Sequence, residues 1–197
     1  MIMSYQKAYF LLSAADVSQL PTDEGVEIAI VGRSNAGKSS VLNRITQNKS
    51  LARVSKTPGR TQLVNVFVID DKRRLIDLPG YGFAKVPLSM KAKWQKLVDN
   101  YINTRASLAG LILVMDIRHP FKELDIKLLE YCEFRELPLH IILNKADKLS
   151  KNEIAKIKHM AKATLTKYRN SVTFQVFSAL RGEGMKELLA RMDDWFL

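Results

Sequence analysis

A run of small and polar residues near the N-terminus has the spacing that phosphate binding requires. Gly32, Gly37, Lys38 and Ser39 form the pattern G-x-x-x-x-G-K-S directly after the apolar run 28–31. The glycines let the backbone curl so that successive N–H groups point at phosphate oxygens, and a helix starting near Lys38 adds the positive end of its dipole. The Lys38 ammonium would then reach the β- and γ-phosphates, and the Ser39 hydroxyl would coordinate Mg²⁺. Strand, loop and helix in this order predict a P-loop, whereas the alternative is an ordinary strand–turn–helix corner.

A second motif, Asp77-Leu78-Pro79-Gly80, ends a later apolar run with the spacing D-x-x-G. The Asp77 carboxylate suits Mg²⁺ through a bridging water, because Mg²⁺ retains part of its hydration shell. The Gly80 N–H can approach a γ-phosphate closely, since no side chain obstructs it. Alone, this motif is weak, because many strand-ending turns contain it.

A third motif, Asn144-Lys145-Ala146-Asp147, points to the base of the nucleotide. The Asp147 carboxylate can accept paired hydrogen bonds from the ring N–H and the exocyclic amine of guanine, and adenine offers neither donor in that arrangement. The Lys145 stem can lie over the base, and Asn144 can connect this loop to the P-loop. The segment 177–179 can offer a backbone N–H to the guanine oxygen. The alternative is a helix cap, because Asn and Asp are common before helices.

These motifs need elements that bring them to one place. Apolar runs predict strands at 28–31, 62–69, 74–78, 111–115, 139–143 and 172–177. Three- and four-residue apolar steps predict helices at 38–45, 90–101, 122–135, 151–168 and 185–195, with Leu124, Leu128 and Tyr131 facing inward in the third. Alternating strands and helices predict an α/β fold, a mostly parallel central sheet flanked by helices on both faces. We expect one domain over residues 1–197, in which 1–25 is a short N-terminal extension and 9–12 a short element or an edge contact.

The net positive charge of the chain indicates what kind of binding partner to expect. The chain has 197 residues, a formal net charge of +11 and a pI near 9.8, which suits a polyanion such as nucleic acid, although a lysine-rich solvated surface would give the same values. Lys151, Lys158, Lys162 and Arg169 fall on one strip of a predicted helix. The single cysteine, Cys132, excludes an internal disulfide, and no apolar run is long enough to span a bilayer. We expect a cytoplasmic protein without a membrane or zinc site.

The complete set of motifs resembles a known family. G-R-S-N-A-G-K-S, T-P-G-R-T-Q, D-L-P-G-Y-G, N-K-A-D and F-S-A, in this order, are similar to the translation-factor-related GTPases. The second and third variants most resemble the EngB (YihA/YsxC) family of bacterial GTP-binding proteins, and the similarity covers nearly the whole chain. The resemblance implies GTP hydrolysis, with Thr61 joining Ser39 as a Mg²⁺ ligand. It also implies a role in large ribosomal subunit assembly, and a need for the protein in cell division and septation.

The expected site follows from the motifs and the resemblance. Candidate catalytic residues are Asn35, Lys38, Thr61 and Gly80, and candidate Mg²⁺ ligands are Ser39, Thr61 and Asp77. Expected nucleotide-binding residues are Gly32, Arg33, Ser34, Asn35, Ala36, Gly37, Lys38, Ser39, Gly59, Arg60, Thr61, Gln62, Leu63, Asp77, Leu78, Pro79, Gly80, Asn144, Lys145, Ala146, Asp147, Phe177, Ser178 and Ala179.

Tyr81 departs from the best-known GTPases, which often carry a water-orienting Gln directly after D-x-x-G. We therefore expect slow intrinsic hydrolysis, completed by a partner or by a cation. In related GTPases without this Gln, an asparagine at the position of Asn35 is associated with K⁺, so the resemblance favours K⁺ binding. The alternative for Asn35 is a residue that stabilises the turn through its own backbone.

Two other functions remain open at this point. One is a P-loop phosphotransferase acting on a small acceptor, and the other is an RNA-binding module in which the nucleotide is structural. The favoured hypothesis is a GTP-hydrolysing switch, expected to be monomeric, that binds ribosomal RNA or a precursor of the large ribosomal subunit.

Overall fold

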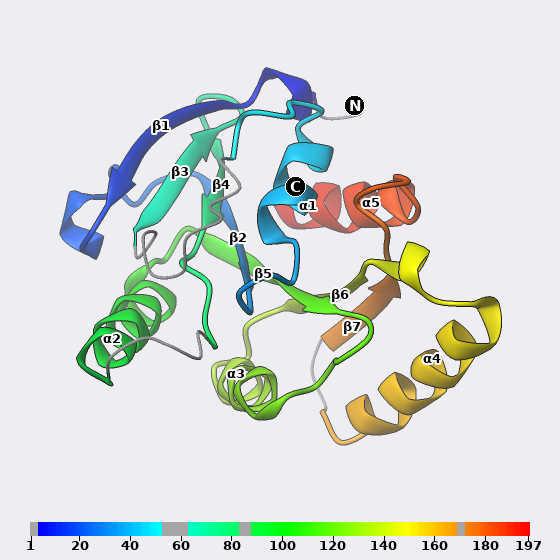
Figure 1. Cartoon of the computed structure of the whole chain (residues 1–197). Coiled ribbons are helices and arrows are strands. Elements are labelled where there is room, and N and C mark those ends of the chain that lie inside the picture. The colour runs from blue at the N-terminus through cyan, green and yellow to red at the C-terminus, as the bar shows by residue number, and fades with distance from the viewer. Residues whose placement is uncertain (1–3, 53–62, 83–87, 169–171) are drawn as a thin grey trace.

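A seven-stranded sheet forms the centre of the protein in a computed structural model, which describes residues 4–52, 63–82, 88–168 and 172–197. The spatial order of the strands is β1-β3-β4-β2-β5-β6-β7 (Figure 1). Their bounds are β1 (Tyr9–Ala14), β2 (Val26–Gly32), β3 (Val64–Val68), β4 (Arg73–Asp77), β5 (Leu108–Asp116), β6 (Leu139–Asn144) and β7 (Val172–Val176). From β4 to β7 all neighbours pair in parallel, whereas the pairs β1–β3 and β3–β4 are antiparallel. The predicted mostly parallel sheet is confirmed.

Helices cover both faces of this sheet, as Figure 1 shows. One face packs against α1 (Lys38–Ile45) and α5 (Met185–Phe196), and the other packs against α2 (Leu88–Thr104), α3 (Glu123–Phe134) and α4 (Lys151–Leu165). Successive strand residues alternate between these layers. In β2, for example, Ile28 and Ile30 join the first core and Ala29 and Val31 the second, all fully buried. Burying one such isoleucine is worth about 1.5–3 kcal/mol, so parallel strands with two apolar faces require both helical layers.

The N-terminal segment contributes to this architecture more than the sequence indicated. The predicted short element at 9–12 is the edge strand β1, and it pairs antiparallel with β3. Before it, η1 (Tyr5–Lys7) packs on α5, where the Tyr5 hydroxyl donates to Asp193 at 2.6 Å. Residues 5–14 are therefore tied to both the sheet and the last helix.

The orientation of α3 corrects one prediction. Leu124, expected to face inward, is 39% exposed, and Leu128 and Tyr131 are only partly buried. The buried line of α3 consists of Asp125, Leu129 and Cys132. An apolar pattern cannot anticipate this rotation, because the residue that faces the core in the first turn is an aspartate.

A buried ionic cluster closes the amino end of β2. The Glu27 carboxylate is fully buried and accepts hydrogen bonds from Arg105 (2.5 and 3.2 Å), Arg74 (3.1 Å) and the Tyr101 hydroxyl (2.8 Å). Asp23 lies 3.5 Å from the Arg105 guanidinium and accepts hydrogen bonds from the backbone and side chain of Ser107. The cluster joins β2, β4 and the end of α2 at the edge of the sheet opposite the motifs.

Candidate nucleotide-binding site

The parallel strands bring the three motifs to the same edge of the sheet. β2 ends at Gly32, β4 ends at Asp77 and β6 ends at Asn144. The strand register aligns Ile30 with Asp77, and Asp116 at the end of β5 with Asn144. Since ligands of open α/β sheets bind beyond the carboxyl ends of the strands, this edge is the candidate site.

The loop between β2 and α1 has the curled backbone that the glycine spacing predicts. Gly37 adopts a left-handed conformation with φ of 96° at the start of α1, and a Cβ at this position would collide with the side-chain amide of Asn144. Asn35 is also left-handed, with φ of 65°, and its side chain is exposed. Asparagine tolerates this conformation better than most residues, which gives Asn35 a conformational role whether or not it also binds K⁺.

The Lys38 ammonium pairs with the Asp77 carboxylate, across the point where β4 lies beside the P-loop. Asp77 is 6% exposed, and its second oxygen accepts a hydrogen bond from Asn65 at 3.2 Å. Phosphates would compete with this pair for the ammonium, and the carboxylate would then be available to a metal-bound water. The donors present, the Asp77 carboxylate and the Ser39 hydroxyl in the first turn of α1, are the oxygen ligands that Mg²⁺ prefers.

Within the described ranges, no three His, Cys, Asp or Glu side chains gather to hold a metal. A Mg²⁺ ion that takes most of its ligands from phosphates and water needs no such cluster. The expected residues 59–62, with Thr61 among them, lie outside the described residues. Leu63 is described, and it lies half-buried just before β3.

Asn144 connects the loops of the site. Its side-chain amide donates to the Ala36 carbonyl at 3.0 Å, and its side-chain oxygen accepts from the Ala179 N–H at 3.1 Å. Asn144 is 2% exposed, so both bonds are shielded from water. The contact to the P-loop that the sequence suggested is present.

Lys145 reaches back over the P-loop from a left-handed backbone position with φ of 70°. Its ammonium donates to the Asn35 carbonyl at 2.5 Å and to Asp116 at 3.0 Å, and Asp116 is also bound by Arg118 at 2.7 Å. Burial raises the pKa of the Asp116 carboxyl, but the hydrogen bonds from Arg118 and Lys145 outweigh it and hold that pKa well below its usual range. No role was predicted for Asp116 or Arg118 from the sequence, although the place of an acid at the end of a buried strand was the available signal.

Asp147 is oriented by Ser178, which lies just after β7. The Ser178 hydroxyl, fully buried, donates to the Asp147 carboxylate at 2.6 Å, and this bond lowers the carboxyl pKa below its usual value. The Ser178 bond thus fixes the direction of a carboxylate that is ionised at neutral pH, as charge-assisted recognition of two donors requires.

The segment 177–179 keeps its backbone N–H groups bonded within the protein in this structure. The three backbone N–H groups all donate within the protein, Phe177 to Leu143, Ser178 to Glu183 and Ala179 to Asn144. An N–H from this segment could bind guanine only if one of these bonds were exchanged on nucleotide binding. What the segment provides directly is the Ser178 hydroxyl.

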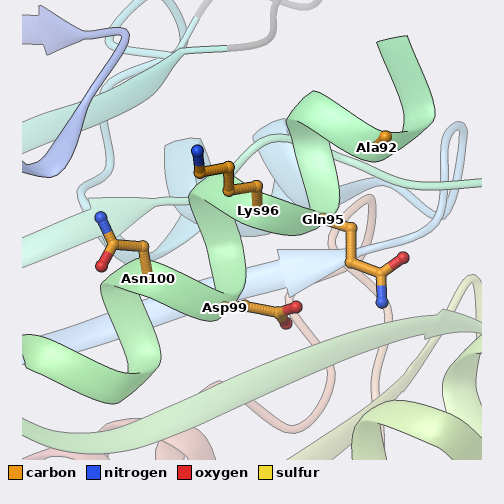
Figure 2. A pocket seen from close by; sticks show the side chains of 5 residues that line it. All are labelled: Ala92, Gln95, Lys96, Asp99 and Asn100. Atoms are coloured by element: carbon orange, nitrogen blue, oxygen red, sulfur yellow. The ribbon is translucent and has the colours of Figure 1, made fainter. Parts of the chain in front are cut away.

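A shallow hollow of about 510 Å³ lies elsewhere, on α2. Figure 2 shows its lining side chains on successive turns of this one helix: Ala92, Gln95, Lys96, Asp99 and Asn100. None of the motif residues lines it, and no second element supplies a converging polar group among those shown. The motifs, and not this hollow, define the site.

No helix in the described part of the chain is long and apolar enough to cross a bilayer.

Comparisons with known proteins agree with this geometry. Residues 27–145 match the family model of the 50S ribosome-binding GTPases, and residues 95–197 match that of the elongation factor Tu GTP-binding domain. A probable GTP-binding protein EngB from Shewanella amazonensis is 51% identical, over 98% of this chain and 91% of its own length. The corresponding protein of Pseudoalteromonas atlantica is 52% identical, over 98% of this chain and 93% of its own length.

Solved structures show the same fold. A crystal structure of a probable GTP-binding protein EngB aligns with a TM-score of 0.62 at 22% identity, covering 87% of this chain and 98% of that one. Era in complex with MgGDPNP and nucleotides of 16S ribosomal RNA aligns with a TM-score of 0.65 at 21% identity, covering 87% of this chain and 57% of that one. The sheet order, the sequence relatives and the family model agree, and the chain therefore belongs to the EngB family of GTP-binding proteins, which has the P-loop GTPase fold.

Proposed function

We propose that this protein hydrolyses GTP slowly and uses the change from GTP to GDP as a switch in the assembly of the large ribosomal subunit. The observation that carries the proposal is that the Lys38–Asp77 pair and Asp147 follow strands that end at the same edge of the sheet. The chain also matches the family model of 50S ribosome-binding GTPases. A need for the protein in cell division and septation would follow from impaired ribosome assembly. Action on a ribosomal precursor would also place the protein in the cytoplasm.

In this proposal the P-loop residues 32–39 bind the phosphates, and Lys38 leaves Asp77 to neutralise their charge. Ser39 and Thr61 would hold Mg²⁺, with Asp77 acting through a water, and the ion would offset charge developing on the phosphate oxygens. Gly80 would donate its N–H to the γ-phosphate. Asp147 would read guanine with its ionised carboxylate, which the Ser178 hydroxyl holds in place.

The surface of α4 supports a polyanionic partner. Lys151, Lys156, Lys158 and Lys162 are exposed, and none of them has an acidic partner within 4 Å among the described residues. The one acid of this helix, Glu153, is already engaged by Ser150, which donates to it at 2.6 Å in a capping box. Arg169, which was expected on the same strip, lies outside the described residues. Unpaired lysines on one helix suit the phosphates of RNA, so we propose ribosomal RNA of a subunit precursor as the partner.

We also propose that K⁺ assists hydrolysis. The Asn35 side chain is exposed at the P-loop, and a monovalent cation there would offset charge developing between the β- and γ-phosphates. Hydrolysis should then be faster in K⁺ than in Na⁺ at equal ionic strength. Asn35→Ala should remove that difference and leave GDP binding largely intact. Equal rates in the two salts, with and without ribosomes, would rule out this part.

The function as a whole is tested by co-sedimentation with ribosomal subunits in the presence of GDP or of a non-hydrolysable GTP analogue. A switch should bind the large subunit with different affinities in the two states. Equal binding in both states would favour an RNA-binding module with a structural nucleotide. Nucleotide-dependent transfer of phosphate to a small acceptor, without subunit binding, would favour a phosphotransferase.

A further inference from the structure

The residue after D-x-x-G, Tyr81, is built into the core. Its side chain is only 2% exposed, and its hydroxyl donates to Asp125 of α3 at 2.5 Å. Asp125 is 1% exposed. Its second carboxylate oxygen accepts the backbone N–H of Lys122 at 2.9 Å, at the start of α3. Tyr81 is thus attached to a carboxylate that is itself fixed by a helix terminus.

The backbone of Tyr81 is attached equally firmly to the P-loop. Its N–H donates to the Gly32 carbonyl at 3.2 Å, and its carbonyl accepts from the Ser34 N–H at 2.7 Å. These two bonds pair Tyr81 with Arg33 in a parallel β-bridge. Gly80, directly before it, lies so close that a Cβ there would be 3.2 Å from the Gly32 carbonyl oxygen. The placement of Gly80 against the P-loop therefore depends on how Tyr81 is held.

We infer that Tyr81 is a positioning residue: through its bond to Asp125 it holds the Gly80 N–H where the γ-phosphate of GTP is recognised, and it couples that contact to α3. The inference rests on the proposed nucleotide site and goes beyond it, because it gives residue 81 a role in distinguishing GTP from GDP. A side chain withdrawn into the core does not orient the attacking water. The bond from Tyr81 is also expected to be strong, because its acceptor is a carboxylate.

The inference predicts a specific pattern of affinities in Tyr81→Phe, which removes the hydroxyl and keeps the ring. Binding of the GTP analogue GppNHp should weaken on the order of tenfold, since loss of a buried hydrogen bond to a charged group typically has an effect of this size. GDP, which has no γ-phosphate, should bind as to the unmodified protein. Titration with fluorescent forms of both nucleotides measures the ratio of the two dissociation constants.

Two variants complete the experiment. Tyr131 lies on α3 and packs against the core cluster that contains Tyr81. Tyr131→Phe also removes a tyrosine hydroxyl, and it should leave the affinities for GDP and GppNHp unchanged. Asp125→Asn removes the charge and leaves one acceptor oxygen for two donors, the Tyr81 hydroxyl and the Lys122 N–H, so it should shift the ratio in the same direction. It also serves as the test if Tyr81→Phe does not fold.

The other outcomes overturn the inference. Unchanged binding of both nucleotides with a large fall in single-turnover hydrolysis would make Tyr81 a direct participant in the reaction. An equal loss of GDP and GppNHp affinity, or a lower melting temperature alone, would reduce Tyr81 to a structural residue. Failure of the unmodified protein to bind either nucleotide would instead contradict the proposed function, so the two failures are distinguishable.

Discussion

Neutralising Glu27 should destabilise the protein without affecting its nucleotide site. Glu27→Gln keeps the shape of the side chain but removes the negative charge that faces Arg105 and Arg74. The Arg105 side chain is only 5% exposed, so water cannot replace the missing carboxylate. Asp23, at 3.5 Å, is the remaining acid that the structure places against it.

The expected cost follows from this burial. Removing one partner of a buried ion pair typically costs 3–5 kcal/mol, because it leaves a buried charge uncompensated. The glutamine oxygen still accepts hydrogen bonds, and Asp23 supplies part of the missing charge, so we expect the lower end, about 3 kcal/mol. Domains of this kind are stable by about 5–15 kcal/mol in total, and urea slopes are about 1–3 kcal/mol/M. The urea midpoint should therefore fall by roughly 1–3 M.

A matched variant separates burial from charge. Glu123→Gln makes the same change in an exposed pair with Lys127 on α3, where solvent screens the interaction, and its urea midpoint should equal that of the unmodified protein. GDP affinity should be unchanged in both variants, because Glu27 lies at the amino end of β2 and the P-loop at its carboxyl end. A midpoint for Glu27→Gln indistinguishable from that of Glu123→Gln would refute the reasoning.

Three further predictions concern the base, the partner and pH. Asp147→Asn should weaken GTP binding by about 2–3 kcal/mol and shift preference toward xanthosine nucleotides, which competition between GTP and XTP measures; unchanged GTP affinity would contradict the assignment. Replacing Lys158 and Lys162 with Gln should reduce the slope of log ribosome affinity against log salt concentration by roughly 0.7–0.9 for each phosphate that is no longer neutralised. Lys127→Gln should leave that slope unchanged. Burial lowers the pKa of His140 to about 4. As the pH falls below about 6.5, this histidine is therefore protonated in the unfolded chain before it is protonated in the folded protein. Stability should therefore decline between about pH 6.5 and 4, by up to about 3 kcal/mol, and His140→Gln should remove that part of the pH dependence in urea titrations.

The parts of the site that the sequence predicted are those encoded over short stretches. The glycine spacing around Lys38 and the acids that end apolar runs, such as Asp77, are local patterns. The preference for parallel strands then brings them together at one edge. This is why the order of the motifs, the helices on both faces and the link from Asn144 to the P-loop could be expected before the structure.

The parts that the sequence did not predict depend on polar pairs between distant segments. Tyr81 and Asp125 are separated by 44 positions, and Glu27 and Arg105 by 78, so no periodicity connects them. The burial of Asp125 also explains the wrong prediction for Leu124, because the apolar pattern of α3 was interpreted as if only apolar residues could face the core. Likewise, the acceptors that the N–H groups of 177–179 find within the fold, among them Glu183, cannot be identified from spacing.

The contacts of Tyr81 in the structure change how this residue is interpreted. From the sequence it is the absence of a glutamine, and that absence predicts slow hydrolysis. In the structure the hydroxyl is bound by Asp125, and the backbone is bound by Gly32 and Ser34. A residue with both attachments cannot also turn toward a water at the γ-phosphate, so the slow hydrolysis that we propose and the placement of Gly80 would have one physical cause. On this proposal the group that completes hydrolysis comes from outside residue 81, and a cation or a bound partner would each provide the missing charge.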